Sequence, residues 1–305
     1  MKESKIIAEI RRLLKDRNGL LLAHNYQNGD VQDIADITGD SLGLSIEASK
    51  TDAEVIVFCG VHFMAESAAI LSPNKTVLLP RMDAGCPMAD MITKDEAVKF
   101  KESYPEAELV TYVNSTADVK SVSDVCCTSA NAIRVVGSVR TDTVLMAPDK
   151  NLARYTARFT DKEVTWWEGF CPTHDNLTAE KLLETKEKHP DAEVLVHPEC
   201  RPEVIDIADH VASTSGMLAH VKKSDKMKFI IGTEIGLIHP LKKGNPGKEF
   251  IPASEKMICP DMKRTTLKDI YDCLNEMKGV VEVPEDIRAK AKISLDRMLQ
   301  VRRDE

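Results

Sequence analysis

Short apolar runs recur along the chain, separated by stretches in which apolar residues have helical spacing. They come in pairs: EVIVFCG (54–60) with TVLLP (76–80), TVLMAP (143–148) with EVTWW (163–167), and KFIIG (228–232) with EFIP (249–252). Short apolar runs of this kind are typical of buried strands. Because strands that alternate with helices form parallel sheets covered by helices, the pattern predicts an α/β fold.

The chain also repeats itself. The stretches LLAHNYQNGDVQDIADITGDSLG, VTYVNSTADVKSVSDVCCTSANA and VLVHPECRPEVIDIADHVASTSG resemble one another and start at residues 21, 110 and 194. Their common landmarks are Asp36, Asp124 and Asp209, which we expect to be structural and to orient the loops around them. The polar residues that share an offset from these aspartates are His24, Tyr112 and His197 at −12, Tyr26, Asn114 and Glu199 at −10, and Ser41, Ser129 and Thr214 at +5.

Three cysteines follow the same repeat. Counted from the aspartates, Cys86 and Cys259 lie at +50 and Cys171 at +47, and a proline follows each of them. The other five cysteines have no threefold match. Those beside or within apolar runs, which we expect to be buried, are Cys59, Cys126 and Cys127. One Cys-Pro in each repeat indicates a shared role for these three thiols.

The repeat predicts three homologous three-layer αβα units, each with a parallel sheet, around a pseudo-threefold axis. We place the units at residues 1–92, 93–177 and 178–305, the last with an added C-terminal helix over 284–303. Ligands of open α/β sheets bind beyond the carboxyl ends of the strands. The polar clusters directly follow apolar runs, so we expect the active site at the centre, where the three strand ends and the three cysteines converge.

Three thiolates at one point repel one another unless a metal neutralises them. Zinc usually recruits a fourth protein ligand, whereas a cubane iron–sulfur cluster on three cysteines leaves one iron open to substrate. The chain has no CxxC pair, which disfavours a zinc ribbon and a ferredoxin. His174 lies three residues after Cys171, and we expect it to contact substrate or support the loop rather than bind metal.

Composition narrows the function classes. The chain has 305 residues, of which 43% are hydrophobic and 30% charged, as in ordinary globular proteins. The net charge of −8 disfavours a nucleic-acid binder, which needs a basic surface. The first residues suggest an amphipathic helix rather than a signal segment, and no apolar run reaches the ~18 residues of a membrane span. We therefore expect a cytoplasmic protein with reduced thiols and neither a nucleic-acid nor a membrane partner.

The same residues carry a family resemblance. The segments LAHNYQ, GDSL, FMAE, CPMA, YVNST, TSANA, PDKNLA, CPTH, HPEC, STSGM, GTEIG and DMK run in order through nearly the whole chain. Together they resemble the quinolinate synthase A family. The resemblance implies a triangle of three α/β units, which agrees with the repeat. Phe170 departs from the family, in which histidine often precedes the second cysteine, and Cys200 in HPEC is out of register with the Cys-Pro cysteines.

The resemblance further implies one [4Fe-4S] cluster per chain, held by Cys86, Cys171 and Cys259 with the fourth iron free. The implied reaction is a dehydrating condensation by a transferase of NAD biosynthesis. It joins iminoaspartate to dihydroxyacetone phosphate, forms quinolinate, and releases phosphate and two waters. An aspartate-oxidising enzyme is the expected supplier of iminoaspartate.

Roles for the remaining residues follow as expectations. We expect Ser41, Ser129 and Thr214 to hold substrate anions at helix N-termini, where amide groups and the helix dipole attract negative charge. Proton transfers dominate the implied chemistry, so an acid or base is needed. The expected hydrogen-bond donors are His24, Asn114 and His197, and the expected catalytic residues are Glu199, His197, Tyr26 and Tyr112. The alternatives are a cluster-dependent hydro-lyase, a structural zinc protein and a sugar-phosphate sensor.

Overall fold

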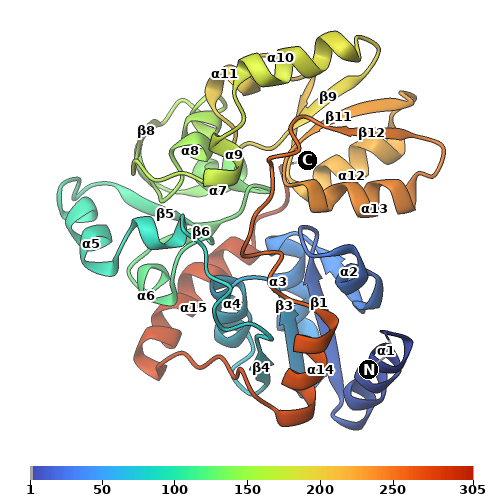
Figure 1. Cartoon of the computed structure of the whole chain (residues 1–305). Helices are drawn as coiled ribbons and strands as arrows, with labels where there is room; N and C mark the ends of the chain where they lie inside the picture. Colours follow the sequence, from blue (N-terminus) through green and yellow to red (C-terminus); the bar gives the residue numbers. More distant parts are fainter. Residues whose placement is uncertain (1–2, 305) are drawn as a thin grey trace.

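The computed structural model describes residues 3–304, which form three α/β units around a common centre (Figure 1). Each unit contains one four-stranded sheet, and all neighbouring strands in it are parallel. The prediction of three α/β units with parallel sheets and flanking helices is confirmed. Within residues 3–304, we find no helix with the length and apolar character of a membrane span.

Four helix–strand pairs follow one another in each unit, and short helical turns are added at different places. The first unit contains α1 (Glu3–Asp16), β1 (Gly19–His24), α2 (Gly29–Ile34), β2 (Ile37–Gly39), α3 (Ser41–Lys50), β3 (Val55–Cys59), α4 (His62–Leu71), β4 (Thr76–Leu78) and η1 (Ala89–Met91). The second contains α5 (Lys94–Glu102), β5 (Glu108–Tyr112), α6 (Ala117–Lys120), β6 (Val125–Cys127), α7 (Ala132–Ser138), β7 (Thr143–Ala147), α8 (Lys150–Ala157), β8 (Glu163–Trp166) and α9 (Pro172–Asp175). The third contains α10 (Ala179–Lys188), β9 (Glu193–Val196), α11 (Pro202–Ile205), β10 (His210–Val211), α12 (Thr214–Lys223), β11 (Lys228–Gly232), η2 (Ile235–Leu237), α13 (Ile238–Gly244) and β12 (Glu249–Pro252). Two further helices follow, α14 (Leu267–Glu276) and α15 (Glu285–Leu299).

The three sheets share one strand order. It is β2-β1-β3-β4 in the first unit, β6-β5-β7-β8 in the second and β10-β9-β11-β12 in the third. The pattern of apolar runs missed the short edge strands β2, β6 and β10, which are two or three residues long and too short for a periodicity to show. The order reverses between the two central strands of each sheet, and this is where open α/β sheets bind ligands.

The three landmark aspartates join each central strand to its edge strand. The Asp36 carboxylate accepts a hydrogen bond from the Leu21 N–H at 2.8 Å, and the Asp36 N–H donates to the Leu21 carbonyl at 2.9 Å. The equivalent pairs are Asp124 with Leu109 and Asp209 with Val194. The expected structural role of these aspartates is confirmed, because each fixes the start of a short edge strand against its neighbour.

A second repeated contact stabilises one helix end in each unit. Lys75 donates to the carbonyls of Thr51 and Ala53, just after α3. The equivalent contacts are those of Lys162 with the carbonyls of Val139 and Thr141 after α7, and of Lys248 with the carbonyls of Val221 and Ser224 at the end of α12. A cation at a helix C-terminus satisfies carbonyls that have no partner inside the helix.

Residues of the central strands alternate between two apolar cores. In β1, Leu22 packs in a core that all three units share, whereas Leu21 and Ala23 pack in a separate core under α1, α2 and α14. The second and third sheets repeat this arrangement with their own outer cores. A period of two is expected for strands that are covered on both faces. The shared core therefore holds the three units together.

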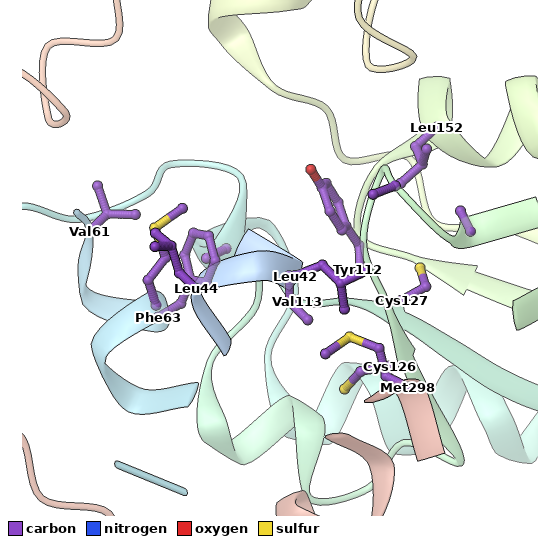
Figure 2. Close-up of a cluster of buried hydrophobic side chains, with 14 of the residues drawn as sticks. Leu42, Leu44, Val61, Phe63, Tyr112, Val113, Cys126, Cys127, Leu152 and Met298 are labelled. Carbon is purple, nitrogen blue, oxygen red and sulfur yellow. The ribbon is translucent and has the colours of Figure 1, made fainter. Parts of the chain in front are cut away.

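The last two helices pack on the first and second units. Helix α14 lies against α1, and α15 lies against α4, α6 and β6. Figure 2 shows Met298 of α15 in the shared core, close to Cys126 and Cys127, which are buried as expected. The Ser294 hydroxyl donates to the Lys120 carbonyl at 2.9 Å. The predicted unit boundaries after residues 92 and 177 stay predictions.

Helix α15 offers a test of this packing. Leu295 is fully buried in the shared core, so Leu295→Ala should lower the free energy of unfolding by about 2–5 kcal/mol through lost contacts and a residual cavity. Ile293 lies on the same helix but is 64% exposed, so Ile293→Ala should change it by less than about 0.5 kcal/mol. Urea denaturation of both variants measures the difference, and equal effects would contradict the packing of α15.

Candidate active site

A pocket opens at the centre of the molecule, and all three units line it. Its wall includes apolar side chains from the first unit, among them Val61, Phe63 and Met64. Every site residue that the sequence predicted also lines it. These residues are His24, Tyr26, Ser41, Cys86, Tyr112, Asn114, Ser129, Cys171, His174, His197, Glu199, Thr214 and Cys259.

The carboxyl ends of the central strands supply the first group of pocket residues. His24 is the last residue of β1, Tyr112 is the last of β5, and His197 directly follows β9. All three are buried, as are Tyr26 and Glu199 two residues further on. The repeated offsets in the sequence thus correspond to equivalent strand ends that converge on one pocket.

The three Cys-Pro cysteines each stand at the start of a tight turn. Cys171 is the N-cap of α9 with proline at its first position, and residues 87 and 260 open turns after Cys86 and Cys259. In each turn, the sulfur accepts a hydrogen bond from the backbone N–H three residues further on. These donors are Ala89 for Cys86, His174 for Cys171 and Met262 for Cys259. Proline suits the first position of such a turn because its φ angle is already close to helical.

Burial and these hydrogen bonds act in opposite directions on the thiols. Burial is the larger effect and raises the pKa of Cys86 to about 12, while the backbone N–H groups lower it. The pKa values of Cys171 and Cys259 are raised in the same way. A metal ion can displace the proton of such a thiol, because its positive charge compensates for the buried negative sulfur. The backbone N–H groups add to the stability of the thiolate.

Two carboxylates support the cysteine turns, and the sequence analysis missed both. Asp149 accepts a hydrogen bond from the Cys171 N–H at 3.1 Å, and Glu234 accepts one from the Cys259 N–H at 3.3 Å. Each carboxylate stands two residues after the third strand of its unit, where the first unit has Val61. Extending the repeat to this offset would have found the pair.

A buried network surrounds His174. Its Nδ1 lies 2.6 Å from Glu199 Oε2 and 3.2 Å from the Cys171 sulfur. Its Nε2 lies 2.8 Å from the Thr233 hydroxyl, which is 2.5 Å from the Tyr26 hydroxyl. His174 therefore joins the second cysteine turn to Glu199 and Tyr26, as the expected support of the loop requires.

The environment assigns a protonation state to each of these groups. Burial lowers the pKa of His24 to about 4 and of His197 to about 3, so both rings are neutral near pH 7. Burial raises the pKa of Tyr26 and Tyr112 well above the usual value, so both phenols keep their protons. Burial alone would raise the pKa of Glu199, but contacts with His174, whose Nδ1 lies 2.6 Å from Oε2, and with Tyr112 outweigh it and lower the pKa, so its carboxylate is ionised.

Two of the three predicted hydroxyls stand at helix N-termini. Ser41 and Thr214 are the first residues of α3 and α12, and the side chains of Asp40 and Ser213 cap these helices. The Asn25 amide donates to the Thr214 hydroxyl at 2.9 Å, so this hydroxyl is held in place at the pocket wall.

The prediction of a helix N-terminus is wrong for Ser129. This residue lies in a turn, and α7 begins only at residue 132 because the Asn131 side chain accepts the Thr128 N–H and closes the turn first. In the first turn of α7, the N–H groups of Ile133 and Arg134 have no acceptor within the helix. They donate to the Asp304 carboxylate at 3.0 and 2.9 Å. The end of α7 therefore already holds an anion of the protein itself.

The residue before Asp304 reaches the first unit. The Arg303 guanidinium makes two hydrogen bonds to the buried Asp40 carboxylate, at 2.5 and 2.8 Å. This bidentate pair keeps the pKa of Asp40 below its usual value against the effect of burial. The segment after α15 thus joins the caps of α3 and α7 beside the pocket.

The pocket residues fit a bound metal centre. The three Cys-Pro thiols are soft donors, and the backbone N–H groups of their turns act in favour of the thiolate. The Glu199 Oε1 and Asn114 Oδ1 atoms are buried, and no side chain or backbone group of residues 3–304 hydrogen-bonds to them. A second possible donor set consists of Cys171, His174 and Glu199, whose ligand atoms lie within 4.8 Å of one another. This set suits a single ion such as zinc.

Comparison with known proteins decides the family. The model of the quinolinate synthetase A protein family matches residues 8–300. The chain belongs to this family. It is 58% identical over 304 residues to the quinolinate synthase of Geotalea uraniireducens, with 100% of both chains covered. It is 54% identical over 302 residues to quinolinate synthase 1 of Methanosarcina acetivorans, with 99% of each chain covered.

The matched range, residues 8–300, spans all three Cys-Pro cysteines and all three strand-end clusters. Cys200 is different. It is fully buried, its sulfur lies 3.5 Å from the Gly232 carbonyl, and it is not among the pocket residues. Its position agrees with the expectation that Cys200 is not a metal ligand.

The neutral state of the two buried histidines predicts how the free energy of unfolding depends on pH. Their pKa values in the folded chain are about 4 for His24 and about 3 for His197, against about 6.5 in an unfolded chain. As pH falls from about 6.5 to about 4, the unfolded chain binds more protons, so the free energy of unfolding falls by ~1.4 kcal/mol per pH unit for each histidine. Denaturation at a series of pH values should show a smaller slope for His24→Gln, and an unchanged slope would contradict the buried neutral ring.

Proposed function

We propose that the protein is a quinolinate synthase, which condenses iminoaspartate with dihydroxyacetone phosphate and releases phosphate and two waters. The observation that carries the proposal is the convergence of three Cys-Pro turns, one from each unit, on the pocket that also holds the strand-end polar groups. The printed names of the relatives support it. The reaction would belong to NAD biosynthesis.

We propose Cys86, Cys171 and Cys259 as the three ligands of one [4Fe-4S] cluster. The donor set supports this, because each sulfur accepts a backbone N–H in an equivalent turn. When bound, such a cluster supplies an open iron that acts as a Lewis acid on a substrate oxygen. The remaining steps depend on what the chain's own residues hold and move.

The substrates would be held as anions, since one carries two carboxylates and the other a phosphate. The first turns of α3 and α12 face the pocket through Ser41 and Thr214, and their dipoles favour negative charge. The Nδ1 atom of neutral His24 accepts the Tyr26 N–H at 3.2 Å, so Nε2 carries the proton and can donate to a substrate oxygen. Asn114 and His197 provide further donors.

Glu199 is the proposed general base. Its carboxylate is ionised, and Oε1 has no protein partner, so it can accept a proton from a substrate carbon or nitrogen. Tyr112 hydrogen-bonds to Glu199 and Tyr26 to Thr233, and both phenols are protonated and can donate to leaving oxygens. His197 stacks on the His174 ring with centroids 4.6 Å apart, which holds both rings beside the carboxylate.

The chemistry of iminoaspartate and of the thiols indicates which enzyme supplies the substrate and in which compartment the protein acts. Iminoaspartate hydrolyses readily, so an aspartate-oxidising enzyme would supply it close to the site of use. Free thiols that bind iron need a reducing compartment, which supports the cytoplasm as the place of action. Neither the supply of iminoaspartate nor the binding of iron requires a nucleic-acid or membrane partner.

Metal analysis tests the cluster directly. Protein purified without oxygen should hold about four irons and four sulfides per chain. Cys86→Ala, Cys171→Ala and Cys259→Ala should each lose the cluster, whereas Cys200→Ala should keep it. One zinc per chain that survives Cys86→Ala but is lost in His174→Ala would instead favour the Cys171, His174 and Glu199 set and a zinc protein.

Substitution of the proposed base tests the reaction. Glu199→Gln keeps the shape of the side chain but removes the base, so kcat should fall by about 10²–10⁴ while the iron content is unchanged. Glu203→Gln, on the exposed face of α11, is the matched control and should be fully active. Quinolinate should form only when both iminoaspartate and dihydroxyacetone phosphate are present. Turnover of a hydroxy acid alone would show a hydro-lyase.

A further inference from the structure

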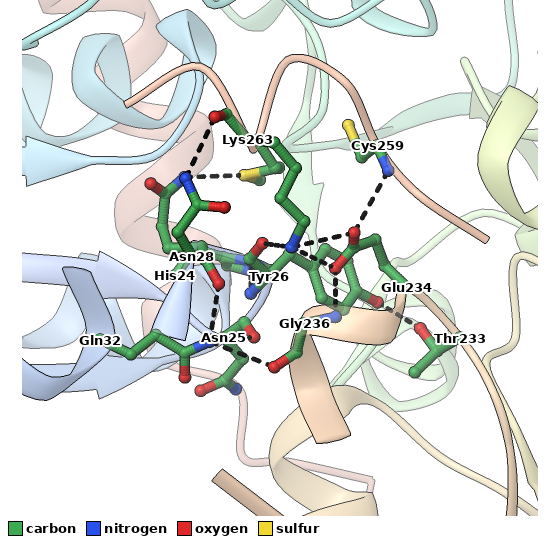
Figure 3. A network of polar contacts seen from close by, with 12 residues as sticks. His24, Asn25, Tyr26, Asn28, Gln32, Thr233, Glu234, Gly236, Cys259 and Lys263 are labelled. Atoms are coloured by element: carbon green, nitrogen blue, oxygen red, sulfur yellow. Dashed lines mark hydrogen bonds and ion pairs between the residues drawn. The ribbon is translucent and has the colours of Figure 1, made fainter. Parts of the chain in front are cut away.

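An ion pair between the partly exposed Lys263 and the buried Glu234, outside the predicted site, joins the Tyr26 loop to the segment after Cys259 (Figure 3). The Lys263 ammonium lies 3.0 and 3.1 Å from the two carboxylate oxygens of Glu234, and it also donates to the Tyr26 carbonyl. Glu234 in turn accepts the Cys259 N–H. One lysine thus contacts both the backbone of a proposed catalytic residue and the carboxylate behind a proposed metal ligand.

The surrounding loop adds to this contact. The Asn28 amide donates to the carbonyls of Lys263 and Thr265 at 3.1 and 3.0 Å, and the Gln27 amide lies 3.5 Å from the Met262 sulfur. Residues 26–28 therefore rest directly on residues 262–265. These two segments are more than 230 residues apart in the chain.

The space between the ammonium and Gly236 is tight. A Cβ atom on Gly236 would lie 2.6 Å from Lys263 Nζ, 2.7 Å from Glu234 Oε2 and 2.8 Å from the Tyr26 carbonyl oxygen. Real Cβ atoms essentially never make contacts this short, so a side chain at residue 236 would have to displace the lysine or the Tyr26 backbone. The Glu234 side chain is fully buried, and loss of its cation would leave an uncompensated charge in the interior.

We propose that Lys263 is a positioning residue for Tyr26. By holding the Tyr26 carbonyl against Glu234, it sets the backbone from which the phenol reaches Thr233 and His174. It also makes that position depend on the segment that carries Cys259. The inference rests on the proposed function, because the proposed reaction is what gives the Tyr26 phenol a task.

A double-substitution experiment on the cluster-containing enzyme tests this role. We expect both Tyr26→Phe and Lys263→Met to lower kcat at least tenfold, with about four irons still bound. Because Lys263 acts through Tyr26, the double variant should be no slower than Tyr26→Phe alone. Lys256→Met, an exposed lysine just before Cys259, is the matched control and should be unchanged.

Hydrogen exchange gives a readout that does not depend on turnover. In Lys263→Met the amides of residues 26–29 should exchange at least tenfold faster than in the wild type, while those of β5 should not change. Gly236→Ala should show the same pattern, because the added methyl group displaces the lysine. This second variant serves as the probe if Lys263→Met does not accumulate as folded protein.

The outcomes separate the two proposals. Unchanged exchange at residues 26–29 in both variants, or a double variant whose kcat loss is the product of the single losses, would overturn the positioning role of Lys263. A wild-type enzyme that forms no quinolinate would overturn the proposed function instead. In that case the exchange experiment still shows whether Lys263 holds the Tyr26 loop.

Discussion

The pocket depends on the register of each central strand against its short edge strand. In all three units, an aspartate carboxylate accepts the N–H of one strand residue, and the pocket side chain stands three residues further on: Leu21 precedes His24, Leu109 precedes Tyr112 and Val194 precedes His197. A strand advances about 3.3 Å per residue and turns its side chains over at every step. A slip of one residue would turn the polar side chain away from the pocket, so this hydrogen bond secures both the sheet and the site.

Burial shapes the chemistry of the pocket through charge. The same removal from water leaves two histidines neutral, keeps two phenols protonated and raises the pKa of all three Cys-Pro thiols. Glu199 is the exception, because its contacts with His174 and Tyr112 stabilise the charged form. Donors and a base thus coexist within one pocket, because the Glu199 carboxylate is ionised while His24, His197 and the two phenols are uncharged. This division of protonation states is what proton-transfer chemistry requires.

The sequence predicted the repeat, the parallel sheets, the strand-end polar groups and the three Cys-Pro cysteines because these follow from spacing, which a fold built from copies preserves. It did not predict contacts between distant segments. The Asp304 carboxylate at α7, the Arg303 pair with Asp40 and the Lys263 bridge each join residues more than 160 positions apart, and no local pattern indicates them. The position of Ser129 was also not predictable, because a helical pattern does not indicate at which residue the helix begins. Asp149 and Glu234 were within reach, since they share an offset in the repeat.

Helix α15 completes the shared core of the first two units although it follows the third in the chain. On the ribosome, the second sheet emerges before the segment that covers β6 and α6 has been made. At about 5–20 residues per second, that delay is on the order of 10 s. During it, the apolar faces that Leu295 and Met298 later cover are open to water and to other chains. The order of synthesis therefore makes the first two units candidates for chaperone binding until residues 285–304 arrive.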